Sequence, residues 1–148
     1  MLIGLDPILS PDLLHGLRSM GHGDEIAIVD GNYPALEHAR RLIRLDGLTL
    51  IPVLEAILSV LPVDEFVDDA IFRSTVGSDP TQREPVHEEI LSACKKQVPG
   101  KHVIPLTGDD FYTRVKNSHT VVATSEPRLY ANIIVRKGVI YPDPRTHV

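Results

Sequence analysis

Two short segments of the sequence carry residue types that suit proton transfer and ligand binding. In the first, His22 lies between Gly21 and Gly23, and Asp30 follows a short apolar stretch. The second, about a hundred residues later, is Tyr130-Ala131-Asn132. An imidazole has an ordinary pKa of about 6.5, so it can give or take a proton near neutrality, and small neighbours leave it accessible. The pattern around His22 therefore indicates acid–base chemistry.

Each of these residues also has a purely structural interpretation. Gly21 can be the left-handed cap of a helix, with His22 merely exposed, and Asp30 can cap its own turn. Asn132 is harder to explain this way, because asparagine suits strands poorly and burying its amide without partners costs about 1–3 kcal/mol. We expect a hydrogen-bonding partner for that amide. A polyol is one candidate, since an amide donates and accepts while the face of Tyr130 can pack on a sugar ring.

Other chemistries find less support in the sequence. His22, Asp24, Asp30 and His38 could suggest a metal site, but no HExxH, His-x-His or cysteine pattern accompanies them, so we expect no catalytic metal. The G-x-S-x-G motif of serine hydrolases and the glycine-rich phosphate loops are absent. The remaining histidines have no distinguishing context and are interpreted as surface or packing residues: His15, His38, His87, His102, His119 and His147.

Hydrophobic periodicity predicts alternating helices and strands. Ser10-Pro11-Asp12 is typical of a helix start and Gly21 of a helix end. Further helices are predicted over 35–41, 49–61, 85–97 and 107–117, and strands over 25–29, 70–76, 102–106, 120–124 and 131–136.

This alternation predicts a three-layer α/β fold, in which a mostly parallel sheet is flanked by helices, as a single domain over residues 1–148. Ligands bind beyond the carboxyl ends of strands in such folds. Asp30 and the loop 125–130 are the candidates for that edge of the sheet.

Composition indicates which binding partners and which cellular compartment to expect. The formal net charge is −5 and the 15 Lys and Arg residues are scattered, so we expect no nucleic-acid partner. Cys94 is the single cysteine, which excludes an intrachain disulfide and fits a reducing compartment. The most apolar stretch, 48–63, is interrupted by Pro52, Glu55 and Pro62, and the first residues do not resemble a signal peptide, so we expect no membrane association and a cytoplasmic location.

An ordered set of motifs resembles a known family. The set consists of Met20-Gly21-His22-Gly23-Asp24-Glu25-Ile26, the Asp30-x-Asn32-x-Pro34 turn, Ile43-Arg44-x-Asp46-Gly47, Phe111-Tyr112-x-Arg114, Val121-Val122-Ala123-Thr124 and Tyr130-x-Asn132-Ile133-Ile134. Together they resemble the RbsD/FucU family of L-fucose mutarotases and D-ribose pyranases over nearly the whole chain.

The resemblance implies an isomerase that interconverts the cyclic forms of a free monosaccharide, most closely L-fucose or a related sugar, without metal or cofactor. It implies an α/β fold and a ring-like homo-oligomer, often a decamer, with sites where subunits meet. By position, His22 is the expected proton donor and Asp30 a sugar ligand. Tyr130, Ala131 and Asn132 are the expected second binding segment.

One position departs from the family pattern. Where ribose pyranases commonly have a histidine and fucose mutarotases an arginine, this chain has Gly108, followed by Asp109 and Asp110. The physiological sugar, any pyranase activity and the subunit number stay open at this point. Two alternatives also stay open: a non-catalytic monosaccharide-binding or sugar-transport accessory protein, and an oligomer with a purely structural role.

Overall fold

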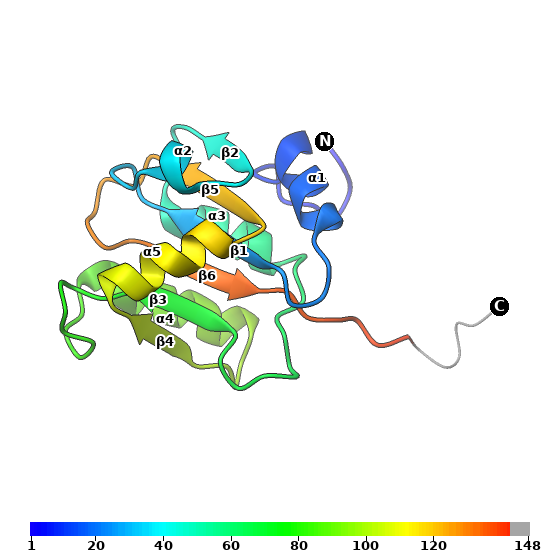
Figure 1. The fold of residues 1–148 in the computed structure, drawn as a ribbon. Helices are drawn as coiled ribbons and strands as arrows, with labels where there is room; N and C mark the ends of the chain where they lie inside the picture. The colour runs from blue at the N-terminus through cyan, green and yellow to red at the C-terminus, as the bar shows by residue number, and fades with distance from the viewer. Residues whose placement is uncertain (143–148) are drawn as a thin grey trace.

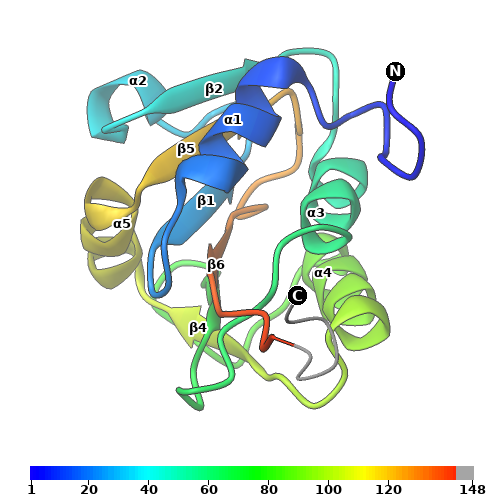
Figure 2. The same ribbon diagram turned by 90° about the vertical axis from the view of Figure 1, so that its right-hand side faces the viewer.

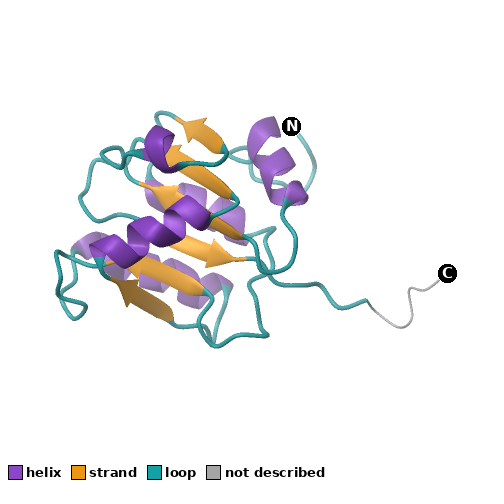
Figure 3. Ribbon diagram, in the orientation of Figure 1, coloured by secondary structure: helices purple, strands orange, loops and turns teal. Residues whose placement is uncertain are grey.

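The computed structural model describes residues 1–142, so that residues 143–148 of the predicted domain, with His147, lie outside the described part. Five helices and six strands lie in the described part and alternate along it, except that the last two strands follow one another (Figures 1 and 3). The helices are α1 (Pro11–Ser19), α2 (Ala35–His38), α3 (Leu50–Leu58), α4 (Pro85–Gln97) and α5 (Gly108–Asn117). The strands are β1 (Glu25–Val29), β2 (Leu42–Leu45), β3 (Ile71–Ser74), β4 (Val103–Leu106), β5 (Thr120–Thr124) and β6 (Ile133–Arg136). No helix in this part of the chain is both long and apolar enough to cross a membrane.

The strands form one sheet in the order β2-β5-β1-β6-β3-β4. Five strands run in the same direction, and β6 runs antiparallel between β1 and β3. The predicted three-layer α/β architecture is therefore confirmed, with a mixed sheet in which most strands are parallel. Helices α3 and α4 cover one face and α5 covers the other, as Figure 2 shows from the edge.

Each face of the sheet has its own hydrophobic core. On one face, Leu13 and Leu17 of α1 join α3, α4 and the strand residues Ile26 and Ile133. On the other face, Phe111 and Val115 of α5 pack against β1, β3 and β5. Burial of these apolar side chains, each contributing about 1.5–3 kcal/mol, fixes the sheet between its two helical layers.

Local sequence signals explain where α1 begins. The Ser10 hydroxyl accepts a hydrogen bond from the Leu13 amide at 3.3 Å, and Pro11 occupies the first turn, where its missing N–H has no intrahelical partner to lose. The predicted helix start is confirmed.

The directions of the strands decide which residues share an edge of the sheet. Asp30 follows β1 and Ser74 ends β3, so both lie at the carboxyl ends of parallel strands. Because β6 is antiparallel, its first residues lie at that same edge, and Asn132 comes directly before them. His22 precedes β1 and Arg136 ends β6, so these two lie at the opposite edge.

Candidate active site

Asp30 is a buried carboxylate at the carboxyl end of β1. Its side chain is 6% exposed, and its Oδ1 accepts a hydrogen bond from the Asn32 amide at 2.9 Å. Burial raises the pKa of this carboxyl above 3.8, against the opposing effect of bonds from Asn32, Asn132 and the backbone of Tyr33 and Ala131. Asp30 thus caps its own turn, and it also lines a cavity of about 350 Å³.

Asn132 holds Asp30 from the neighbouring strand. Its Oδ1 accepts a bond from the Asp30 amide at 2.9 Å, and its Nδ2 donates to Asp30 Oδ2 at 3.0 Å and to Ser74 Oγ at 3.4 Å. The expectation that this amide needs a partner is confirmed, and its partners within the chain are Asp30 and Ser74. Its principal effect is to orient the Asp30 carboxylate.

Tyr130 lies on the wall of the same cavity, together with Asp30 and Asn132. Its backbone has φ of 60°. Ala131, which lies between Tyr130 and Asn132 in the sequence, has a fully buried side chain that belongs to the hydrophobic core and does not line the cavity. Only the backbone of Ala131 therefore faces the site, where it contributes to the environment of Asp30.

Aromatic residues that were not among the predicted site residues complete the cavity. Tyr33 and Tyr112 line it, with their rings in an edge-on arrangement at 5.4 Å. The Tyr33 hydroxyl lies 2.9 Å from His38 Nδ1. Burial, with smaller contributions from Tyr112 and Asp30, raises the pKa of Tyr33. The signal that could have found them is their place in two of the family motifs: Tyr33 lies in the turn that Asp30 caps, and Tyr112 follows Phe111.

Gly108 also lines the cavity, at the start of α5. A Cβ placed there would have no neighbouring atom within 4 Å, so the position adds open space instead of a side chain. Asp109 is the adjacent lining residue. Two acidic residues, Asp30 and Asp109, therefore face a cavity with aromatic walls, a combination that suits a neutral polyol better than a phosphate.

His22 lies at the other edge of the sheet. Its Nε2 is 3.1 Å from each oxygen of Asp64, a residue 42 positions along the chain with 0% exposure. Arg136 Nε donates to Asp64 Oδ2 at 2.8 Å, and the Phe66 amide donates to Oδ1 at 3.0 Å. Burial raises the pKa of Asp64, but these hydrogen bonds together with that from His22 outweigh it and hold the pKa at about 2.

Asp64 determines which nitrogen of the His22 ring carries the proton. An ionised carboxylate only accepts hydrogen bonds, so the His22 nitrogen beside it, Nε2, carries a proton and Nδ1 is left to exchange one. The His22 side chain is 43% exposed and its ring lies 5.2 Å from the ring of Phe66. This is an oriented, accessible histidine hydrogen-bonded to a buried carboxylate, the arrangement that fixes the tautomer of the histidine in a serine-protease triad.

Within one chain, His22 and Asp30 do not line the same cavity. The five residues of β1 separate the two edges of the sheet by about 13 Å of extended strand. The structure brings Asp30, Tyr130 and Asn132 together and places His22 elsewhere. For the same reason, the four residues weighed as metal ligands do not gather at one point.

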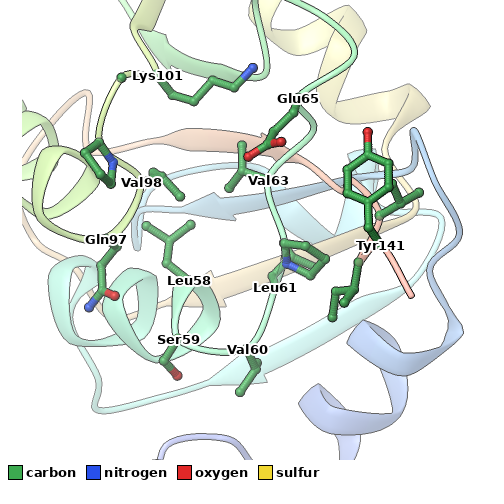
Figure 4. Close-up of a pocket in the computed structure, with 15 residues that line it drawn as sticks. Leu58, Ser59, Val60, Leu61, Val63, Glu65, Gln97, Val98, Lys101 and Tyr141 are labelled. Carbon is green, nitrogen blue, oxygen red and sulfur yellow. The ribbon is translucent and has the colours of Figure 1, made fainter. Parts of the chain in front are cut away.

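A larger cavity of about 830 Å³ lies between the ends of α3 and α4 and the segment Val139–Tyr141 (Figure 4). None of the residues singled out from the sequence lines it. The 350 Å³ cavity at Asp30 is therefore the candidate binding site. Because Asp30 lines a cavity, the purely structural interpretation of the protein loses its main support.

Comparisons with known proteins show which family this chain belongs to. The model of the RbsD / FucU transport protein family matches residues 3–140. The fucose mutarotase of Homo sapiens is 39% identical over 97% of this chain and 97% of its own length. The L-fucose mutarotase of Haemophilus influenzae is 37% identical over 94% of this chain and 97% of its own.

The fold is shared with solved structures as well. The crystal structure of the fucose mutarotase from Streptococcus pneumoniae in complex with L-fucose superimposes with a TM-score of 0.82 at 38% identity, covering 95% of this chain and all of that one. With a family match over nearly its whole length and relatives of this similarity, the chain belongs to the RbsD / FucU transport protein family.

Proposed function

We propose that this protein is an isomerase, a sugar mutarotase that interconverts the anomers of a free monosaccharide, with L-fucose or a related sugar as its substrate. The observation that carries the proposal is the cavity formed by Asp30, Asn132 and three tyrosines, in a chain whose relatives are named fucose mutarotases. The Asp30 carboxylate would accept hydrogen bonds from sugar hydroxyls, and the rings of Tyr130, Tyr33 and Tyr112 would pack on the C–H faces of the sugar.

The reaction requires only proton transfers. A base removes the proton of the anomeric hydroxyl, an acid protonates the ring oxygen, and the ring opens to the free aldehyde. Rotation about the bond to the aldehyde carbon and closure on its other face gives the other anomer, and closure through another hydroxyl changes the ring size. Positioned acid–base groups contribute about 10²- to 10⁴-fold to such steps. In this protein, Nδ1 of His22 is the atom that exchanges the proton, while Asp64 holds the ring in the tautomer that leaves Nδ1 able to accept one.

The proposal includes an assembly in which His22 of one copy meets the Asp30 cavity of a second copy. Exposed apolar side chains at both edges of the sheet support it. Phe66 lies against the His22 ring and Tyr141 against Phe66; both are exposed, as is Ile140, the residue before Tyr141. Leu129 and Tyr112 are exposed at the cavity that Asp30 lines. A soluble monomer gains nothing by exposing such groups, whereas their contact across an interface would be favourable.

A contact between two different edges is heterologous, and heterologous contacts close into rings when the rotation between copies permits. We therefore propose a ring-like homo-oligomer, with a decamer as the expected size and the cytoplasm as the expected compartment. In such an assembly, the proton-transfer group and the binding cavity that lie apart in one chain would come together between two copies.

Anomer exchange measured by NMR tests the function. Saturation transfer between the α and β anomers of L-fucose, D-ribose, L-rhamnose and D-galactose, with and without protein, reveals any acceleration over buffer. We expect acceleration for L-fucose and its loss in His22→Ala. Retention of the full rate in that variant would exclude His22 from the chemistry.

A non-catalytic monosaccharide-binding protein is the second candidate. Gly108 favours it, because no side chain at this position reaches into the cavity, and no histidine among residues 1–142 lines its wall. In that case the sugar would bind, as isothermal titration calorimetry would show, but exchange would be no faster than in buffer.

A further inference from the structure

Tyr130 has an unusual backbone conformation. With φ of 60°, it is the one non-glycine residue with a positive φ in the described part of the chain. The left-handed region is unfavourable for residues with a Cβ, and such residues persist only where their surroundings hold them. The surroundings of Tyr130 therefore need to supply that constraint.

The carbonyl oxygen of Tyr130 receives two hydrogen bonds. Ser74 Oγ donates to it at 2.9 Å, and His87 Nε2 lies 2.9 Å away on α4. His87 is 0% exposed, whereas Tyr130 lies at the cavity wall. A buried imidazole thus reaches the backbone of a binding residue from outside the cavity.

The second nitrogen of His87 fixes the proton on the first. His87 Nδ1 accepts a hydrogen bond from the Glu84 amide at 3.0 Å, as part of the cap of α4. An imidazole nitrogen that accepts a bond carries no proton, so Nε2 carries it and donates to Tyr130. Both ring nitrogens are engaged within the protein, and the imidazole has no nitrogen left for a ligand.

The charges around His87 favour its neutral form. Burial lowers its pKa below 6.5, and Arg73 on β3 and Arg83 before α4 lower it further, against the opposing effects of the Tyr130 carbonyl and Glu84. A protonated ring would place an N–H against the N–H of Glu84. The neutral ring is therefore the form that keeps both bonds.

We propose that His87 is a positioning residue for the sugar-binding cavity, which holds Tyr130 in its left-handed conformation so that the tyrosine ring forms one wall. The proposal rests on the proposed function for the part that concerns sugar binding. Ser74 connects the same arrangement to the rest of the site, because it also contacts Asn132, which orients Asp30. Loss of the His87 bond would loosen the wall and leave the carboxylate in place.

Two substitutions separate the two bonds of the imidazole. The amide of asparagine occupies the position of Nδ1, so His87→Asn retains an acceptor for Glu84 and loses the donor to Tyr130. The amide of glutamine reaches the position of Nε2, so His87→Gln retains the donor and loses the acceptor. Crystal structures, melting temperatures and the kinetics of L-fucose anomer exchange are measured for both variants and the unmodified protein.

We expect opposite patterns in the two variants. In His87→Asn, Tyr130 leaves the left-handed region and KM rises about fivefold, the scale of one lost hydrogen bond, with a smaller change in kcat. In His87→Gln, φ of Tyr130 stays positive and KM stays within about twofold of the unmodified protein, while the melting temperature falls because the helix cap is lost.

Two results would overturn the proposal. One is a His87→Asn protein in which φ of Tyr130 and KM are unchanged. The other is a rise of KM in both variants in proportion to their loss of melting temperature, as a merely structural role predicts. If His87→Asn does not fold, His87→Gln decides alone: the proposal requires φ of Tyr130 to stay positive and KM to stay within about twofold in that variant, and a loss of either would overturn it. Absence of exchange activity in the unmodified protein would refute the proposed function, whereas φ of Tyr130 in the variants would still decide the role of His87.

Discussion

Replacing Asp64 by asparagine should impair proton transfer while preserving the shape of the site. Asp64 is fully buried and accepts hydrogen bonds from Arg136, Phe66 and, in the assigned tautomer, His22. An asparagine has one oxygen and one NH₂ group, so it can accept from only one side and opposes a donor on the other. The His22 ring would then favour the tautomer that carries its proton on Nδ1, which is the wrong atom for accepting one.

The size of the effect follows from the tautomer of the His22 ring. In serine proteases the corresponding substitution, which also leaves the ring in the wrong tautomer, costs about 10⁴-fold in kcat. The His22 side chain is 43% exposed, so solvent can replace part of the lost orienting bond. For the exposed His22 we expect a loss of about 10²- to 10³-fold.

The assay is two-dimensional exchange NMR on L-fucose at pH 7, with the oligomeric state and melting temperature of each variant recorded. Asp69→Asn is the matched control, because Asp69 is an exposed carboxylate on the same loop and should tolerate the change. An Asp64→Asn protein that is folded, assembles normally and exchanges anomers at the unmodified rate would refute the role assigned to Asp64.

Three further predictions concern binding, stability and assembly. Asn132→Ala removes two hydrogen bonds to Asp30 and should raise KM for L-fucose about tenfold, with little change in the pH dependence of kcat. The free energy of unfolding should decrease as the pH falls from 6.5 through the lowered folded-state pKa of His87, because the unfolded chain binds the proton first. Urea denaturation at several pH values measures this decrease, which should be shallower in His87→Asn. Ile140→Asp places a charge on an exposed apolar side chain near the His22 edge and should shift the protein to smaller species in light scattering, whereas an unchanged mass would place the interface elsewhere.

Local signals in the sequence were sufficient for most elements of the fold. Ser10 and Pro11 marked the start of α1, and the apolar spacing of α3 and α4 predicted helices close to their observed bounds. Strand β2 (Leu42–Leu45) was not predicted. It is a four-residue outermost strand of the sheet, and only Leu45 is buried, so its sequence has no clear alternation of apolar and polar residues. The antiparallel direction of β6 depends on partners far away in the sequence, which no local pattern encodes.

The candidate site, like the fold, was predicted only in part. Asp30, Tyr130 and Asn132 were predicted from residue type and family resemblance, and the structure brings them together. Asp64 and His87 were missed, because each acts through a contact more than forty residues away and has no distinguishing neighbours. The separation of His22 from Asp30 was missed because the two residues are close in the sequence. They lie at opposite ends of one strand, β1, whose extended length keeps them apart.

Mixed oligomers test most directly whether His22 and Asp30 act across copies. His22→Ala and Asp30→Asn proteins, each inactive alone, are unfolded together in equal amounts and refolded, and L-fucose anomer exchange is measured by NMR. If every site combines His22 of one copy with Asp30 of the next, about a quarter of the sites in the mixture carry both residues, so about a quarter of the unmodified activity should return. A mixture whose oligomers contain both variants and yet show no activity above that of the separate proteins would contradict the account.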